Sequence, residues 1–323
     1  MEHKKHVVLG IESSCDEAAI GIVSDGKVLY QDLYSSAKVQ AQFGGVIPEI
    51  ASRLHEENMQ KMLAKLVKDF DVSQITDIVY TARPGLIGGL HVANTFAKTL
   101  GWQWGLHPIG VSHIGGHIFS AAINEKEVKY PFLALVVSGK TSSIFKVSSP
   151  SNITQLVCTT DDAAGECLDK IGRRLGIDYP AGKTIDETYK DDLAVVPLIE
   201  HSGKNENFSF SGFKTHILTL INNNNNHHKY SKEQIAASAM KWIVDEMVHK
   251  LHYWATVYHI NNVFVGGGVS ASQTLKHALE KEPWIKSLHM TDLKYTGDNG
   301  VMMAYYGEKY LQSNDQNPCQ QSI

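Results

Sequence analysis

The order of apolar and polar positions along the chain predicts strands and helices in alternation. The run "HVVLGIESS" (residues 6–14) predicts a buried strand, and "AAIGIVSDGKVLYQDLYSS" (18–36) predicts a hairpin that turns at Asp25-Gly26. After Pro48, apolar residues recur at helical spacing as far as Phe70. Strand-to-helix units follow at 75–102 and 107–123. This alternation is typical of an α/β layer built on a sheet.

The same pattern starts again in the second half of the chain. A buried strand, a small polar loop at Ser138-Gly139 and a returning strand are predicted at 131–149, and a strand, an acidic turn and a helix at 155–177. A long helix follows at 231–258, then a strand, a triple glycine and a helix at 261–282. The Asn-rich stretch 221–231 is predicted to be an exposed connector. Two halves that open alike predict a duplicated architecture with a cleft between them.

Composition narrows the class of protein. With 323 residues, 43% of them hydrophobic, the chain is long enough for two domains, and no apolar run approaches the roughly 20 residues of a membrane helix. The net charge of −4 argues against a generally basic surface, so any RNA contact would need a local patch of Lys and Arg or a partner. The four cysteines lack CxxC spacing, and the N-terminus shows neither an apolar signal core nor a presequence. These features predict a reducing, intracellular compartment.

His113 and His117 are four positions apart at the start of a predicted helix, so their imidazoles would share one face and could bind one metal ion. Ile114 stands where the zinc-protease pattern has its catalytic Glu, which disfavours peptide hydrolysis. The spacing fits equally well two histidines that are hydrogen-bonded at a domain interface. Asp298 precedes another helical pattern and could cap that helix or act as a third ligand. Capping is the commoner role for an Asp at such a position.

Three small-residue loops each follow a predicted strand, at 12–19, 137–143 and 265–272. Their backbone N–H groups and hydroxyls can face an anionic ligand without obstruction by side chains. Each loop alone is more often simply a turn, but together they predict a nucleotide in an interdomain cleft. Asp169 could accept hydrogen bonds from its ribose. Further loop contacts are expected from Ser14, Cys15, Asp16, Glu17, Gly267 and Gly268.

Eight motifs follow one another between about residues 7 and 311: "GIESSCDEAAIGIV", "GGVIPEIASRLHEENM", "PGLIGGLHVANTFAKTLGW", "GVSHIGGHI", "GECLDKIGRRLGIDYPAGK", "FSFSGFKT", "VGGGVSAS" and "DNGVMMAYYG". In order and spacing they resemble the tRNA N6-threonylcarbamoyladenosine transferase family, formerly called O-sialoglycoprotein endopeptidase, in its bacterial and mitochondrial branch. The resemblance implies a two-domain actin-like fold of the sugar-kinase and Hsp70 type, with duplicated subdomains around a nucleotide cleft. It also implies transfer of the threonylcarbamoyl group from threonylcarbamoyl-AMP to N6 of the adenosine adjacent to the anticodon, in tRNAs that read codons starting with A.

The resemblance assigns residues to two sites. His113, His117 and Asp298 become the ligands of one divalent metal ion, iron or zinc. The substrate-binding residues that it implies are Val136, Val137, Ser138, Gly139, Lys140, Asp169, Gly182, Asp186 and Ser272. ATP, ADP or AMP could occupy the same cleft. The resemblance further implies tRNA as a partner, a homodimer or accessory subunits, and no membrane. It implies a cytoplasmic bacterial protein, or one of mitochondria or another organelle.

This chain departs from the family pattern in or near the expected cleft. Arg83 stands where the family has glycine, Lys140 and Thr141 replace a glycine and a histidine, and Ser272 replaces an asparagine. An alternative hypothesis is therefore a catalytically impaired paralogue that binds nucleotide and acts as a platform for protein assembly. A small-molecule kinase is a third hypothesis, which the histidine pair disfavours.

The expected division of the chain places a first subdomain at 1–110 and a second at 111–297. The C-terminal helix, 298–323, is expected to pack back on the first.

Overall fold

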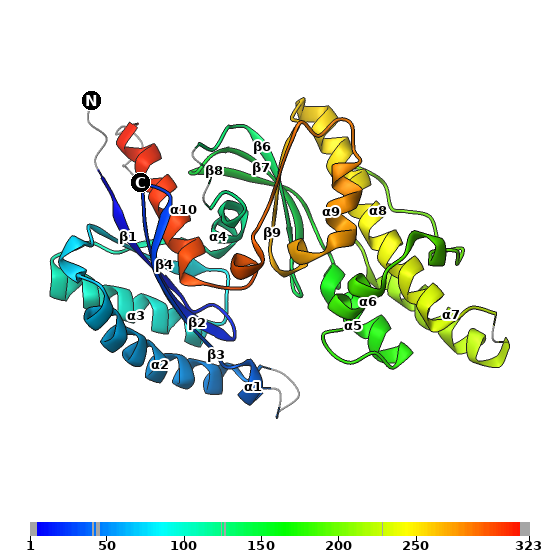
Figure 1. Cartoon of the computed structure of the whole chain (residues 1–323), viewed down its shortest axis with the longest axis horizontal. Coiled ribbons are helices and arrows are strands. Elements are labelled where there is room, and N and C mark those ends of the chain that lie inside the picture. The colour runs from blue at the N-terminus through cyan, green and yellow to red at the C-terminus, as the bar shows by residue number, and fades with distance from the viewer. Residues whose placement is uncertain are drawn as a thin grey trace. The chain divides into compact units, whose positions relative to one another are not determined.

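The computed structural model describes residues 5–40, 42, 46–123, 125, 127–227 and 229–316. The chain divides into two compact units (Figure 1). Unit 1 comprises Met1–Val128, Ser149–Asn152 and Asp292–Ile323, and unit 2 comprises Lys129–Ser148 and Ile153–Thr291. Each unit has its own five-stranded sheet and its own apolar core, which confirms the predicted α/β class.

The sheet of unit 1 has the strand order β3-β2-β1-β4-β5. Strands β1 (Val7–Glu12), β2 (Glu17–Ser24) and β3 (Lys27–Ser35) are antiparallel, while β4 (Asp77–Arg83) and β5 (Ile109–Ser112) add parallel pairings. The hairpin between β2 and β3 turns where predicted, since Asp25 and Gly26 have φ of 51° and 73°. The helices of this unit are α1 (Ala37–Gln40), α2 (Pro48–Asp69), α3 (Ile87–Trp104), α4 (His113–Ser120) and α10 (Gly300–Gln316). Short 3₁₀ helices lie at Val72–Gln74 and Leu293–Tyr295.

Helix α10 lies directly on β1 and β2 because glycines remove the side chains that would separate them. A Cβ on Gly10 would lie 2.3 Å from Ala304 N, and one on Gly300 would lie 2.2 Å from the carbonyl carbon of Ile20. The close approach brings Asp298, two residues before the helix, to the unit that carries β1 and α4.

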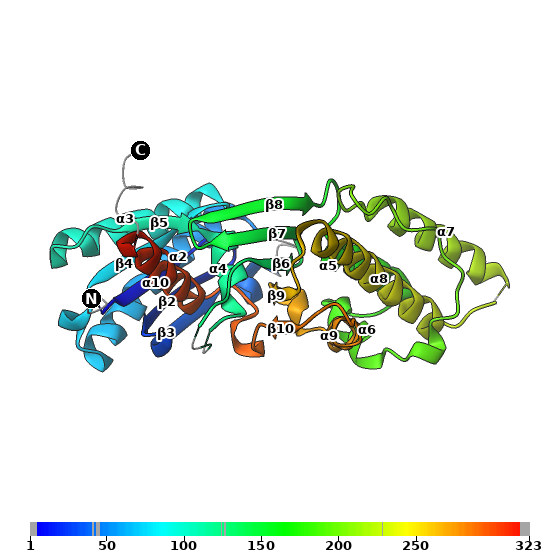
Figure 2. The ribbon, with the colours of Figure 1, turned by 90° about the horizontal axis from the view of Figure 1, so that it is seen from above.

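The sheet of unit 2 has the order β10-β9-β6-β7-β8, and Figure 2 shows these strands side by side. The strands are β6 (Phe132–Val137), β7 (Ser142–Ser149), β8 (Asn152–Cys158), β9 (Asn262–Gly266) and β10 (Ser287–Met290). Read in the opposite direction, this order is β8-β7-β6-β9-β10, which is the order of unit 1 with five added to each strand number. The repeat found in the sequence is therefore a repeat of sheet topology.

The helices of unit 2 are α5 (Ala164–Leu175), α6 (Ala181–Thr188), α7 (Ser211–His227), α8 (Lys232–Tyr258) and α9 (Gln273–Glu280). Helix α8 contacts β6 and packs against the other four, and α9 contacts β10. Short 3₁₀ helices lie at Asp191–Leu193 and Gly268–Ala271. None of the helices in the described ranges has the length and apolar composition needed to span a membrane.

The compact units do not divide at residue 110. Residues 111–128 join unit 1 because β5 pairs with β4 and α4 packs on α10. The prediction of an exposed connector at 221–231 is wrong over most of that range, because α7 continues to His227. Ile217 and Ile221 are buried in the core of unit 2 and anchor the helix there. Residues 317–323 of the expected C-terminal helix, with Cys319, lie outside the described residues.

Candidate functional site

Helix α4 presents the two histidines because its glycines let it pack tightly on α10. A Cβ on Gly115 would lie 2.2 Å from the ring of Tyr306, and one on Gly116 would lie 2.7 Å from the sulfur of Met303. The motif "HIGGH" thus combines two functions: its glycines face α10, and its histidines extend from one turn of the helix.

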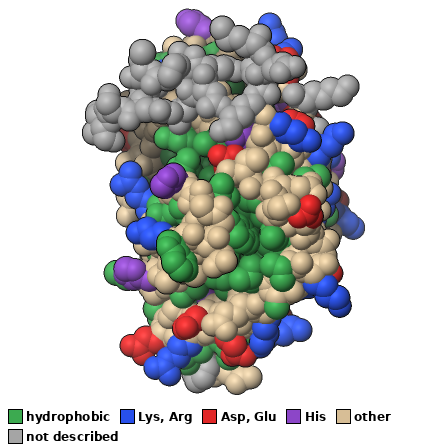
Figure 3. Space-filling view, turned by 90° about the vertical axis from the view of Figure 1, so that its left-hand side faces the viewer, with side chains coloured by type: hydrophobic (Ala, Val, Ile, Leu, Met, Phe, Trp, Pro, Cys, Tyr) green, Lys and Arg blue, Asp and Glu red, His purple; other side chains and the backbone are tan. Residues whose placement is uncertain are grey.

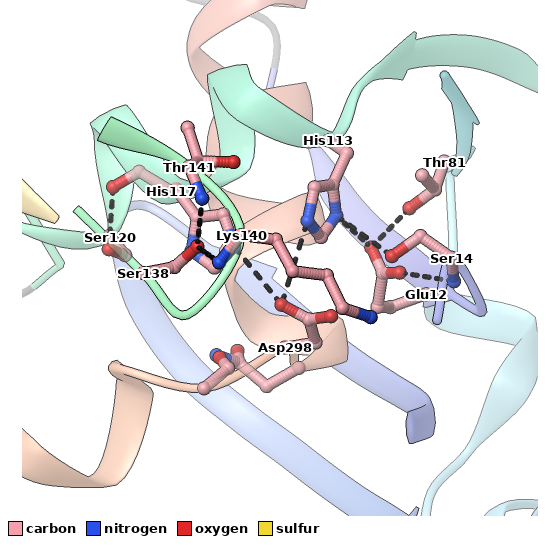
Figure 4. Close-up of polar contacts among 12 residues, drawn as sticks. Glu12, Ser14, Thr81, His113, His117, Ser120, Ser138, Lys140, Thr141 and Asp298 are labelled. Atoms are coloured by element: carbon pink, nitrogen blue, oxygen red, sulfur yellow. Dashed lines mark hydrogen bonds and ion pairs between the residues drawn. The ribbon is translucent and has the colours of Figure 1, made fainter. Parts of the chain in front are cut away.

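Asp298 does not cap α10. That role belongs to the next residue, since Asn299 Oδ1 accepts a hydrogen bond of 2.8 Å from Met302 N. The Oδ1 atom of Asp298 instead lies 3.0 Å from Nε2 of His117 and 3.6 Å from Nε2 of His113 (Figure 4). Among the described residues, these three side chains are the one cluster of potential ligand residues (His, Cys, Asp or Glu) that could hold a metal ion. Their ligand atoms lie within 4.8 Å of one another.

Glu12, at the end of β1, lies behind His113. The carboxylate is fully buried, and its Oε2 lies 3.1 Å from His113 Nδ1. Thr81 Oγ1 donates to the same oxygen, and Ser14 N donates to Oε1 at 2.7 Å (Figure 4). The Ser14 hydroxyl also lies 3.2 Å from His113 Nδ1. One imidazole nitrogen of His113 therefore faces Glu12, and the other faces Asp298.

Negative charge gathers around this group. Burial lowers the pKa of His113, but the carboxylates of Glu12 and then Asp298 outweigh it and raise the value to about 9. Burial, followed by the charges of Asp16 and Asp298, raises the pKa of Glu17 to about 8. The raised pKa of His113 shows that the nearby carboxylates favour positive charge at this point of unit 1, whereas burial is the first cause of the raised pKa of Glu17.

The residues present fit a divalent metal ion. Two imidazole nitrogens and one carboxylate are ligands that zinc and iron accept. Nδ1 of His117 is buried and has no hydrogen-bond partner among the described residues, whereas Nε2 of the same ring lies 3.0 Å from Asp298. The arrangement can therefore hold a cation beside which an acyl or phosphate oxygen would be polarised.

Unit 2 contains a cavity of about 350 Å³ that collects several of the predicted substrate residues. Gly139, Asp169, Gly182, Asp186, Gly268 and Ser272 line it. The sequence reasoning gave no role to Leu168 and Met240, which form the apolar part of the wall together with Val269 and Ala271 of the loop at 265–272. The exposed ring of Tyr179 belongs to the small-residue segment 178–183, which the sequence marks as a possible wall of the cleft; Met240 belongs to the buried stripe of α8, where no local signal separates it from core.

The two aspartates of this cavity are already engaged. Asp169 Oδ1 accepts hydrogen bonds from Ala181 N at 2.8 Å and Gly182 N at 3.3 Å. Asp186 accepts from Ser272 Oγ at 2.7 Å and from the backbone N–H groups of Gln273 and Thr274. Each carboxylate therefore caps a helix of the cavity wall, α6 or α9, as well as lining the space.

Other predicted substrate residues do not line this cavity. Val136 and Val137 are fully buried in β6, and a Cβ on Gly267 would lie 2.5 Å from Val137 O. The loop after β6 closes on itself, since Lys140 N and Thr141 N both donate to Ser138 Oγ. Ser14, Cys15, Asp16 and Glu17 belong to unit 1, in the loop after β1 and at the start of β2, and Arg83 is exposed at the end of β4.

Comparison with known proteins identifies the family. The tRNA N6-adenosine threonylcarbamoyltransferase family matches residues 27–305. A protein of that name from Ureaplasma urealyticum is 38% identical over 306 residues, covering 94% of this chain and 95% of the relative. The chain belongs to this family. Another tRNA N6-adenosine threonylcarbamoyltransferase, from Mycoplasmoides gallisepticum, is 39% identical over 316 residues, covering 94% of this chain and 98% of its own. Membership confirms the resemblance and the predicted class, a transferase that modifies tRNA, and neither name favours an impaired paralogue.

Solved structures agree on the fold. HypF from T. kodakarensis matches with a TM-score of 0.68 at 17% identity, covering 96% of this chain and 48% of its own. Component A of the (R)-2-hydroxyglutaryl-CoA dehydratase of Acidaminococcus fermentans matches with a TM-score of 0.54 at 13% identity, covering 94% of this chain and 99% of its own. At such low sequence identity these two matches are evidence for the fold alone. They confirm the predicted actin-like fold for this member of the threonylcarbamoyltransferase family.

Proposed function

We propose that the protein transfers a threonylcarbamoyl group from threonylcarbamoyl-AMP to N6 of the adenosine adjacent to the anticodon, in tRNAs that read codons starting with A. The observation that carries the proposal is the intact His113, His117 and Asp298 group in a chain of this family. Because the relatives are bacterial and the substrate is tRNA, we infer action in a bacterial cytoplasm.

Iron or zinc is the metal that we propose for this group. When bound, such an ion supplies a Lewis acid that polarises an acyl or phosphoryl oxygen. The residues of the chain prepare the position: Asp298 offers a carboxylate oxygen, and the Nε2 atoms of both histidines lie within 3.6 Å of it. Glu12 accepts a hydrogen bond from Nδ1 of His113, which leaves Nε2 of that ring directed at Asp298.

We propose the cavity of unit 2 as the adenylate site. Its volume lies within the roughly 300–1,000 Å³ of small-molecule sites. Gly139 and Gly268 have ordinary φ angles, and a Cβ on either would meet no protein atom within 4 Å. Neither backbone strain nor close packing accounts for these two glycines, and their lack of side chains leaves open space that a ligand could fill.

Gly182→Ala tests this site with a matched control. The position is helical and a Cβ would lie 3.8 Å from Leu168, so alanine should fold as well as glycine or better. The added methyl group narrows the cavity, and we expect the affinity for AMP, measured by calorimetry, to fall about tenfold. Gly212→Ala on α7 offers the same gain in helix propensity outside the cavity and should leave AMP affinity unchanged. Equal AMP affinity in both variants would place the adenylate elsewhere.

We further propose that partner subunits, or a second copy in a homodimer, hold part of the tRNA. The net charge is −4, and on the described part of the face in Figure 3 the Lys and Arg side chains are interspersed with Asp and Glu. A filter-binding titration at physiological salt should therefore show weak tRNA binding by the chain alone. Tight binding by the chain alone would contradict this part of the proposal.

The transfer itself is tested with threonylcarbamoyl-AMP that carries labelled threonine. The acceptors are an unmodified tRNA that reads a codon starting with A, and the same tRNA with guanosine in place of the target adenosine. We expect label on the first tRNA alone, because guanosine lacks the N6 amine. If no label is incorporated even with the accessory proteins of a related system added, the impaired paralogue becomes the better account.

A further inference from the structure

We propose that Glu12 is a positioning residue that fixes the orientation and the ring-nitrogen roles of His113 toward the metal. The proposal rests on the metal site proposed above. It concerns a residue that the sequence placed in a loop motif but assigned no role.

The direction of the hydrogen bond between Glu12 and His113 determines which ring nitrogen carries the proton. A carboxylate can only accept, so the 3.1 Å contact between Glu12 Oε2 and His113 Nδ1 places a proton on Nδ1. The lone pair of the neutral ring then belongs to Nε2, which is the atom directed at Asp298. Carboxylates that hold a metal-binding histidine in this way orient the ring and raise its strength as a ligand.

Glu12 cannot turn away from His113. Thr81 from β4 donates to one carboxylate oxygen, and the backbone N–H of Ser14 donates to the other at 2.7 Å (Figure 4). The side chain is fully buried, away from bulk solvent. His113 therefore faces an acceptor whose place is set by β1, β4 and the loop after β1.

The start of α3 holds the loop that follows Glu12. Leu86 N donates to Ser14 O at 2.7 Å, and a Cβ on Gly89 would lie 2.4 Å from Ser13 O. A Cβ on Gly85 would lie 2.8 Å from Ser14 O. These approaches explain Gly85 and Gly89 of "PGLIGG", which let the start of α3 close on the loop that follows Glu12, whereas Gly88 lies against Ser52 of α2.

The buried charge of Glu12 also bears on the metal. In the described part of the chain no Lys or Arg forms an ion pair with this fully buried carboxylate, and the ring of His113 is its one partner within ion-pair distance. A metal ion on the far side of the ring strengthens that pairing through the imidazole. Glu12 and the metal therefore stabilise each other's contact with His113.

The experiment titrates the full chain, freed of metal, with Co²⁺ and follows its visible absorption. We expect Glu12→Gln to keep the fold but to raise the dissociation constant for Co²⁺ about 10- to 100-fold and to shift the absorption band at saturation. Glu246→Gln is the matched control: Glu246 is also fully buried and pairs with a histidine Nδ1, at 3.0 Å, but belongs to unit 2. It should leave both the Co²⁺ affinity and the band unchanged.

Thr81→Val gives a second test if Glu12→Gln fails to fold. It removes one donor to Glu12 with little change of shape, and we expect a smaller loss of Co²⁺ affinity in the same direction. Unchanged affinity and band in Glu12→Gln, or in Thr81→Val where that is the folded variant, would overturn the positioning role. Failure of the metal site itself is distinguishable, because the wild type would then bind Co²⁺ no better than His113→Ala.

Discussion

Each unit contains a buried glutamate that pairs with a histidine, and the two pairs differ in what completes them. In unit 1, Glu12 lies 3.1 Å from Nδ1 of His113 and accepts from a threonine hydroxyl. In unit 2, Glu246 lies 3.0 Å from Nδ1 of His201 and accepts from a serine hydroxyl. The local chemistry is the same.

The difference lies in the counter-charge. Lys250, fully buried one turn along α8, lies 3.3 Å from Glu246 and donates to two backbone carbonyls, while the ring of His201 stacks on Trp242. This cluster is closed by the protein itself. The ring of His113 instead makes an edge contact with the ring of His117 and faces Asp298, and these two residues are the other proposed metal ligands. A buried carboxylate and histidine thus indicate function only where the protein does not supply the remaining charge.

The largest expected effect is on metal content. Asp298→Ala removes one of the three proposed ligands, and we expect equilibrium dialysis against Zn²⁺ followed by elemental analysis to find one bound ion per chain in the wild type and none in the variant. His201→Ala should keep the ion. A full equivalent of Zn²⁺ in Asp298→Ala would remove the distinction between the two pairs.

The next effect is on the stability of unit 2. Lys250→Met leaves the buried charge of Glu246 without its cation, and we expect the free energy of unfolding in urea to fall by about 3–5 kcal/mol. Lys241→Met on the same helix breaks the half-exposed pair with Asp245 and should cost at most about 1 kcal/mol. Equal losses in the two variants would show that the buried pair has no special role.

The third effect is a pH dependence in the acid range. Burial raises the pKa of Glu246, but the contacts with His201, Ser202 and Lys250 outweigh it and lower the value below the ordinary 4.5. A lowered carboxyl pKa contributes stability above pH 4.5 that is lost as the pH falls through the folded-state value. Urea midpoints of the wild type should therefore drop more steeply below pH 4.5 than those of Glu246→Gln. Parallel profiles would contradict this.

The smallest effect is a pH dependence in unit 1. Burial lowers the pKa of His55, whose Nδ1 lies 2.8 Å from the buried hydroxyl of Ser13. The folded state then resists a proton that the unfolded state accepts below pH 6.5, so stability falls as the pH drops below that value. His55→Gln should flatten the difference between stability at pH 7 and stability below 6.5. A wild type with no such difference would show that His55 takes its proton while folded.

Local chemistry made much of the fold predictable. The hairpin at Asp25-Gly26 follows from the positive φ that this dipeptide tolerates, and the helix from Pro48 follows from apolar periodicity. The periodicity also placed His113 and His117 on one turn. The role of Asp298 could not be decided from local sequence, because Asp298 and Asn299 are both good helix caps. Only the structure shows that Asn299 caps α10.

Contacts between distant segments were not predictable from the residues. Glu12 lies 101 positions from His113, and nothing in its local sequence announces a histidine partner. Met240 resembles any other buried position on α8, although it lines the cavity of unit 2. Such residues are set by how β1, α4 and α8 pack, and that information is spread over many side chains.

The most direct measurement compares the rate of threonylcarbamoyl transfer to tRNA by the wild type, His113→Ala and His201→Ala, all at equal concentrations of folded protein. We predict that His113→Ala incorporates no label above background while His201→Ala stays close to the wild-type rate. Wild-type transfer by His113→Ala, or an equal loss in both variants, would contradict the assignment of the catalytic centre to His113, His117 and Asp298.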